Sequence, residues 1–333
     1  MRQRQFLLAV IGAALILLPA SSPDAAARKP PWRAWKSKGH LEHTLTGRVY
    51  AAKKGLFLTP IELADKLAVN DYILLGETHD NLDHHILQAW LINRIAHYDR
   101  RPAIVWEMID LNQSLALANH LKNFKLPAAK LGDALDWGKS GWPAWSTYLP
   151  IARRAYQFRL AMSAGSARNE DVKEIGQKGL ASVEESERER LGLDFRLGWD
   201  LTRALRQELK ASHCDMLPDE ALENMQDVQR YRDAILADQL LAAGSRKGAV
   251  LIAGSGHVRH DRAVPWYLRN RNPDASIVTL MLIEVTEETA FAEDFVPKDP
   301  FGKPTVDYVW FTPRHERTDP CEAFKKQLDK KKK

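Results

Sequence analysis

Two glutamates and two histidines have the residue types and the spacing of a catalytic or metal-binding site. Both histidines end a Gly-x-x-His pattern, and each of the four residues follows a short apolar segment of the chain. An imidazole titrates near neutral pH and a carboxylate in a cleft can be shifted toward that range, so this set suits general acid–base catalysis. We predict catalytic roles for Glu77, His79, Glu107 and His257.

The same residue types are also ligands of zinc, manganese and iron. His79, Glu107 and His257 are the predicted metal ligands, with a divalent metal ion as a candidate cofactor. The alternative is structural, because a histidine just after a strand can cap a helix or bond a loop carbonyl. Two copies of the Gly-x-x-His pattern, together with Glu107 at another strand end, favour the functional interpretation.

A second group of residues suits a flat, apolar cofactor. Aromatic side chains crowd residues 137–156, and two adjacent histidines follow His79 on the first turn of a predicted helix. Aromatic rings pack against flat ligands, and a tyrosine phenolate can coordinate ferric haem. An aromatic cluster that only packs in the core is the alternative. The candidate cofactor-binding residues are His84, His85, Trp142, Tyr148 and Tyr156.

Short apolar runs indicate the buried strands that would position these residues. They cover residues 71–75, 103–106, 159–163, 248–253, 276–285 and 307–311, the last as an edge strand. Helical patterns alternate with the runs, and residues 169–245 form an additional helical segment. This alternation predicts an α/β fold with a mostly parallel central sheet flanked by helices. Ligands of such sheets bind outside the carboxyl ends of the strands, where the candidate residues lie.

The N-terminal segment has the pattern of an export signal. Arg2 and Arg4 precede an apolar run at residues 6–18, and small residues follow it. We therefore predict a signal peptide at residues 1–27 and a periplasmic location, with an uncleaved signal anchor as the alternative. No cysteine lies near the cleavage region, so a lipid anchor of the lipoprotein type is not predicted.

The rest of the chain is predicted to comprise a linker at residues 28–54, an α/β domain at residues 55–325 and a basic tail at residues 326–333. The 333 residues carry a net charge of +5, part of which lies in the tail. This small excess, without a stripe of basic and aromatic residues, predicts no nucleic-acid partner. Cys214 and Cys321 are expected to form a disulfide in an exported protein, and two unpaired thiols are the alternative.

Several motifs together resemble those of the ChaN-like haem-binding proteins of bacteria. The resemblance covers residues 50–325, nearly the whole chain after the predicted signal. The combined set is specific, although no single motif would be. The matching segments are residues 74–81 with His84, His85 and Gln88; Glu107 and Met108; and residues 141–150, 229–234, 252–259, 307–311 and 319–321.

The resemblance implies an α/β fold, an envelope location, and a role in haem binding and iron acquisition. Many members of the family are lipoproteins, and this chain departs from them in lacking the lipidated cysteine. The family also resembles the wider Tiki, TraB and erythromycin-esterase-like group, in which paired Gly-x-x-His motifs and a glutamate form a metal-dependent hydrolytic centre. Those features correspond here to His79, His257 and Glu107.

Two functional hypotheses follow. The first is a periplasmic haem-binding protein for haem or iron uptake, with envelope transport partners and a homodimer as candidate associations. The haem would lie against residues 142–156, and its iron would be bound by Tyr148, Tyr156 or one of the histidines at positions 79, 84 and 85. The second is a metal-dependent hydrolase in which Glu77 acts as general base on metal-bound water.

Overall fold

The computed structural model describes residues 29–331, apart from residues 99 and 246. The predicted signal peptide lies outside the described residues. The chain divides into two units, Met1–Pro30 and Pro31–Lys333, and the second unit contains the fold described below. Among the described residues, no helix is both long enough and apolar enough to cross a membrane.

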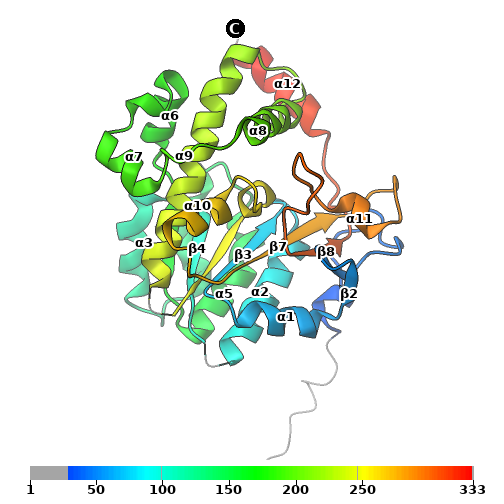
Figure 1. Ribbon diagram of the computed structural model, residues 1–333. Helices are drawn as coiled ribbons and strands as arrows, with labels where there is room; N and C mark the ends of the chain where they lie inside the picture. Colours follow the sequence, from blue (N-terminus) through cyan, green and yellow to red (C-terminus); the bar gives the residue numbers. More distant parts are fainter. Residues whose placement is uncertain (1–28, 99, 246, 332–333) are drawn as a thin grey trace, which may run out of the picture. The chain divides into compact units, whose positions relative to one another are not determined.

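An eight-stranded sheet lies at the centre of the second unit, with the strand order β2-β1-β8-β7-β3-β6-β4-β5. The six strands β8, β7, β3, β6, β4 and β5 are parallel to one another. Strands β1 and β2 form an antiparallel hairpin, and β1 pairs antiparallel with β8. The predicted α/β fold with a mostly parallel sheet is therefore confirmed (Figure 1). The strands are β1 (Val49–Ala51), β2 (Leu56–Leu58), β3 (Tyr72–Glu77), β4 (Ala103–Asp110), β5 (Met162–Ser166), β6 (Ala249–Gly254), β7 (Ile277–Glu284) and β8 (Tyr308–Thr312).

Helices cover both faces of the sheet (Figure 1). The core on one face includes α1 (Pro60–Ala68), α2 (Leu82–His97), α3 (Ser114–Leu121), α4 (Leu131–Ala134) and α5 (Trp145–Phe158). The core on the other face includes α6 (Asn169–Lys178), α7 (Glu185–Leu191), α9 (Asp219–Gly244), α10 (Val264–Arg271) and α11 (Ala292–Phe295). The remaining helices are α8 (Trp199–Ser212) and α12 (Pro320–Lys331).

The central strands are apolar on both faces because helices cover both sides of the sheet. In β3, Ile73 and Leu75 pack into the core that contains α2 and α5, whereas Leu74 packs into the core that contains α9. Every residue of β3 is buried. A charged side chain is therefore placed only at the carboxyl end of the strand, where Glu77 ends β3.

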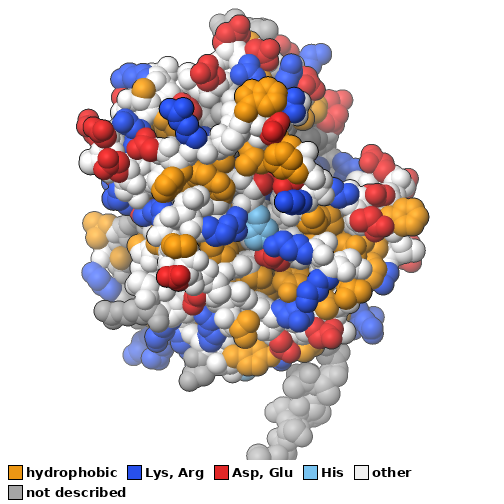
Figure 2. Space-filling view, in the orientation of Figure 1, with side chains coloured by type: hydrophobic (Ala, Val, Ile, Leu, Met, Phe, Trp, Pro, Cys, Tyr) orange, Lys and Arg blue, Asp and Glu red, His pale blue; other side chains and the backbone are white. Residues whose placement is uncertain are grey.

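The additional helical segment predicted at residues 169–245 is present as α6 to α9. On the face of the molecule shown in Figure 2, basic and acidic side chains are interspersed around apolar ones.

The prediction that residues 307–311 form an edge strand is wrong. The corresponding strand, β8, lies between β7 and β1, because the N-terminal hairpin pairs with its free side. The sheet instead ends at β2 and β5. Pairing between strands that lie some 250 residues apart leaves no local trace in the sequence of β8, so this neighbour could not be predicted from it.

The segment predicted as a linker packs on the domain from Pro31 onward. The backbone N–H of Ser37 donates to the Asp83 carboxylate at 2.7 Å, and the rings of Trp32 and Trp90 lie 4.8 Å apart. At the other end of the chain, most of the predicted basic tail belongs to α12. Both ends of the predicted domain therefore extend further than the composition of the sequence indicates.

The predicted disulfide between Cys214 and Cys321 is confirmed. It joins the turn after α8 to α12, and the rings of His213 and Phe324 contact each other beside it. In the unfolded chain this bond would close a loop of 107 residues. We expect its reduction to lower the free energy of unfolding by about 4–5 kcal/mol, on the loop-entropy model.

This expectation is tested by urea unfolding of the protein with and without dithiothreitol. The control is the double variant Cys214→Ser/Cys321→Ser, whose stability should match that of the reduced protein and should not respond to the reductant. Equal stability of the oxidised protein and the double variant would contradict it.

Candidate functional site

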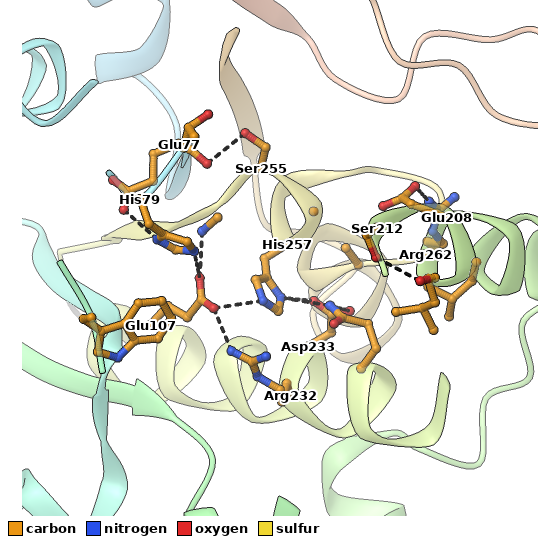
Figure 3. Close-up of a pocket in the computed structure, with 18 residues that line it drawn as sticks. Glu77, His79, Glu107, Glu208, Ser212, Arg232, Asp233, Ser255, His257 and Arg262 are labelled. Carbon is orange, nitrogen blue, oxygen red and sulfur yellow. Dashed lines mark hydrogen bonds and ion pairs between the residues drawn. The ribbon is translucent and has the colours of Figure 1, made fainter. Parts of the chain in front are cut away.

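Three neighbouring parallel strands, β3, β6 and β4, bring the predicted catalytic residues to one end of the sheet. Glu77 is the last residue of β3, Glu107 lies near the end of β4, and the loops that leave β3 and β6 supply His79 and His257. All four residues line one cavity of about 580 Å³ (Figure 3). The convergence expected from the strand pattern is present in the structure.

Both glycines that begin the Gly-x-x-His patterns are required by close packing. A Cβ atom at Gly76 would lie 2.6 Å from Cγ2 of Val258, and one at Gly254 would lie 2.8 Å from Nε2 of His79. These separations are shorter than van der Waals contact, so any larger residue would displace its neighbour. The two loops can therefore approach each other closely enough to share one site.

Glu77 is a buried carboxylate held between two imidazoles. Its Oε1 lies 3.1 Å from Nδ1 of His79, and its Oε2 lies 3.0 Å from Nδ1 of His85. Burial raises the pKa of Glu77, but the imidazoles of His85 and His79 outweigh it and hold the pKa at about 2. Glu77 is therefore charged at neutral pH and fixes the orientation of the His79 ring.

Glu107 accepts hydrogen bonds from three directions. The backbone N–H of Gly254 donates at 2.7 Å, Arg232 donates at 2.8 Å, and Nε2 of His257 lies 3.1 Å away. Burial raises the pKa of Glu107, but the positive charges of His257, His79 and Arg232 outweigh burial and hold it well below its usual range. The carboxylate thus ties the ends of β4 and β6 to α9.

His257 lies between two carboxylates. Its Nδ1 is 2.7 Å from Oδ1 of Asp233 on α9, and its Nε2 faces Glu107. Burial lowers the pKa of His257, but the two acids outweigh it and raise the pKa to about 9. Burial raises the pKa of Asp233 itself, against the effect of His257. The ring is therefore protonated at neutral pH and donates to both carboxylates.

The raised pKa of His257 predicts a pH dependence of stability. The folded pKa of His257, about 9, exceeds the ordinary histidine pKa of 6.5, so the folded state binds the proton more tightly. This contribution is fully present below about pH 6.5 and is lost as the pH rises through about 9. Burial lowers the pKa of His79, but its hydrogen bond to Glu77 and the charge of Glu107 outweigh burial and raise the pKa, which adds an effect of the same sign.

We therefore expect the free energy of unfolding to fall by a few kcal/mol, roughly 3, between pH 6.5 and pH 9. Urea unfolding across this range measures the effect. The same series on His257→Asn provides the control, and its profile should be flatter. A wild-type profile as flat as that of the variant would contradict a protonated His257.

Of the two histidines that line the cavity, His79 is the more exposed. Its side chain is 30% exposed, whereas that of His257 is 7% exposed. The His79 ring lies 4.7 Å from the ring of Trp142, and its Nε2 lies 3.9 Å from Oε2 of Glu107, beyond hydrogen-bonding distance. Nδ1 is thus anchored by Glu77, and Nε2 remains available to a ligand.

The candidate cofactor-binding residues are not brought together in the cavity. Trp142 lines it, but the side chains of His84, His85 and Tyr148 are fully buried behind it. Burial lowers the pKa of His84 to about 3, and its two nitrogens bond the backbone N–H of Thr78 and the hydroxyl of Thr312. In this structure His84 is therefore a neutral structural residue.

His85 and Tyr148 support the site from behind. Nε2 of His85 lies 3.1 Å from the carbonyl oxygen of His79, and the Tyr148 hydroxyl donates to the same oxygen at 3.3 Å. Burial raises the pKa of Tyr148 far above its usual value, which disfavours the phenolate that would coordinate iron. Tyr156 packs elsewhere, against Phe124, and burial raises its pKa to about 12.

The side chains of His79, Glu107 and His257 do not surround a vacant point as metal ligands would. Both ring nitrogens of His257 face carboxylates, and Glu107 is engaged by Arg232 and a backbone N–H. Within the described residues, no group of three or more His, Cys, Asp or Glu side chains is arranged to hold a metal ion. Glu107 and His257 are instead bonded to each other and to α9, and His79 is bonded to Glu77.

Residues of α8, α9 and the loop before α10 complete the cavity and were not among the predicted site residues. Asp233 and Arg232 were within a motif of the family resemblance, at residues 229–234, which is the signal that could have identified them. The contributions of α8 and of the loop before α10 had no such signal. These lining residues are Leu205, Glu208, Leu209, Ser212, Arg262 and Ala263.

Fold and site together define an α/β protein with an acid–imidazole site at the carboxyl end of a parallel sheet. The chain belongs to the family described as haem-binding uptake, Tiki superfamily, ChaN, whose model matches residues 63–268. No curated protein matches the sequence.

Two solved structures are similar to this chain to different degrees. The fold is similar to that of ChaN of Campylobacter jejuni, a structure described as showing cofacial haem binding, with a TM-score of 0.61 and 19% identity over 79% of this chain and 95% of that one. An erythromycin esterase in its open conformation has a TM-score of 0.41 and 12% identity, over 80% of this chain and 82% of that one.

Proposed function

We propose that this protein binds haem in the cavity at the carboxyl ends of β3, β6 and β4, with His79 as the iron ligand. One observation carries the proposal: His79 presents an available Nε2 to the cavity while Glu77 holds its Nδ1 at 3.1 Å. A carboxylate behind a coordinating histidine fixes the ring and raises its basicity as a ligand. Membership of the haem-binding uptake family supports the choice of haem.

The other walls of the cavity fit the chemistry of haem. Trp142 contacts the His79 ring, and Leu205 and Leu209 of α8 supply apolar surface. Arg232 and Arg262 supply positive charge for the two propionates. The volume of about 580 Å³ falls in the range of roughly 300–1,000 Å³ that is typical of small-molecule sites. When bound, haem would supply iron chemistry, and the protein would supply orientation and charge.

The proposed role is haem or iron uptake in the periplasm. The pattern of Arg2, Arg4 and the apolar run at residues 6–18 supports export, and the disulfide fits an oxidising compartment. We include envelope transport partners and a homodimer in this proposal. The homodimer is motivated by the cofacial haem binding of the related Campylobacter jejuni protein.

Titration of the purified apoprotein with haemin tests the function. We expect a saturable shift of the Soret band at micromolar haemin. Sedimentation of the same samples reports whether haem binding is accompanied by dimer formation. A Soret band that never saturates, or that matches haemin with an unrelated protein, would remove the proposal.

Hydrolysis is a second candidate, favoured by the paired acids and imidazoles at the cavity. Glu77 positions His79, and Nε2 of that imidazole faces the space where a substrate would lie. This arrangement suits general base catalysis on a bound water molecule. If a metal ion took part, His79 would be the ligand most open to it, because His257 is enclosed by two acids.

Metal analysis of protein purified without chelators, combined with assays on peptides and esters, tests this candidate. Hydrolysis that disappears in His79→Ala would support it. A metal-free protein without any hydrolysis in the presence of added zinc or manganese would contradict it.

A further inference from the structure

A pair of buried arginines lies beside the cavity and is distinct from the acid–imidazole site of Glu77, His79, Glu107 and His257. The side chains of Arg259 and Arg262 are 9% and 4% exposed, and both come from the loop between β6 and α10. Arg262 lines the cavity directly. Two guanidinium groups removed from water in this way require negative partners, because a buried unpaired charge is costly.

Asp261 supplies the first negative partner. Its side chain is 5% exposed and accepts from Arg259 at 2.9 Å and from Arg262 at 2.9 Å. Two arginines with one aspartate leave a net charge of +1. The positive charge that remains points to a second anion at this position.

The second anion is supplied by a different element of the fold. Glu208 of α8 reaches across to hydrogen-bond Arg262 (Figure 3). Its carboxylate also lies 3.8 Å from the guanidinium of Arg259. Glu208 differs from Asp261 because its side chain is 46% exposed. An exposed carboxylate on a surface helix can exchange its guanidinium partner for water at little cost, whereas the buried aspartate cannot.

We propose that Arg262, backed by Arg259, is a binding site for a carboxylate of the ligand, and that Glu208 occupies this site when no ligand is bound. One carboxylate replaces another, so the charge of the buried arginine pair stays balanced throughout. The guanidinium of Arg262 provides the geometry for paired bonds to a carboxylate. Glu208 is thus an internal competitor that favours ligands with a carboxylate able to reach Arg262.

This inference rests on the proposed haem-binding function and assigns one propionate of haem to Arg262. It also gives α8 a defined role. The helix lines the cavity through Leu205 and Leu209 and is held to the opposite wall by Glu208. Displacement of Glu208 removes that attachment, while the disulfide at Cys214 keeps the end of the helix tied to α12.

The experiment compares the affinity of wild type and Glu208→Gln for haemin and for haemin with both propionates methylated. Removing the competing carboxylate should tighten haemin binding about two- to fivefold, the range of a partly exposed ion pair. The methylated compound should bind both proteins equally, because it cannot use Arg262. A matched control is Asp200→Asn, which removes the same charge from α8 at an exposed pair with Arg203 and should leave haemin affinity unchanged.

A second variant, Arg262→Gln, should weaken haemin binding and abolish the effect of Glu208→Gln in the double variant. Haemin affinity that is the same or weaker in Glu208→Gln would overturn the inference while leaving haem binding intact. The same holds for an equal gain with the methylated compound, which would indicate a general opening of the cavity. Wild type that binds neither compound would instead overturn the proposed function, and this inference with it.

Discussion

Replacing Glu107 by glutamine is expected to lower the free energy of unfolding by about 3–5 kcal/mol. The carboxylate is 3% exposed and pairs with both Arg232 and His257. The amide would keep the shape of the side chain, but the buried His257 would retain only Asp233 as an acidic partner and the half-buried Arg232 would lose its carboxylate. The loss would also lower the pKa of His257, because Glu107 is one of the two acids that raise it.

Chemical denaturation followed by circular dichroism measures this effect. The matched control is Glu174→Gln, which removes an exposed carboxylate paired with Lys178 on α6 and should change stability by less than about 1 kcal/mol. If Glu107→Gln were as stable as this control, the buried network would not hold β4, β6 and α9 together as described.

Replacing His79 by alanine is expected to weaken haemin binding by more than tenfold and to change the position of the Soret band. Loss of an outer-shell partner alone typically costs about 10–100-fold in metal affinity, and a direct ligand contributes at least as much. The Glu77→Gln variant should therefore fall between wild type and His79→Ala. Optical titration of the variants, with circular dichroism to verify folding, provides the measurement.

Tyr148→Phe tests whether Tyr148, rather than His79, is the iron ligand. The Tyr148 hydroxyl is directed at the carbonyl oxygen of His79 from behind the site, so its removal should leave the haem spectrum unchanged. A Tyr148→Phe variant that loses haemin binding, beside a His79→Ala variant that retains it, would assign coordination to the tyrosine.

The strand ends of the candidate site could be predicted because buried parallel strands are apolar throughout. In β3 and β6 the first polar or glycine residues mark the carboxyl end, so Glu77 and His257 could be located from the sequence. The sheet order then places these ends side by side. The arrangement of the strands therefore explains why these residues could be expected to lie close together.

The helical contributions could not be predicted in the same way. In a long helix such as α9, periodicity shows which face is apolar. It does not show that Asp233 on this helix bonds His257, which lies 24 residues further along the chain. The position of α8 over the cavity depends on long-range contacts, including the bond of Glu208 to Arg262. Such long-range contacts cannot be predicted from the local sequence.

The aromatic cluster shows a different limit. Trp142 and Tyr148 are six positions apart in an apolar segment, yet one lines the cavity and the other is fully buried in the core. A buried core and the wall of a cofactor site are both apolar, so composition cannot distinguish them. The start of α5 at Trp145 determines the difference, because Tyr148 lies on the face that packs against α2.

The most direct measurement is a crystal structure of the protein co-crystallised with haemin. We expect the haem between α8 and the ends of β3, β6 and β4, with its iron coordinated by Nε2 of His79 and its ring against Trp142. Haem bound through Tyr156 or at the outer surface, with the cavity empty, would contradict the proposed site.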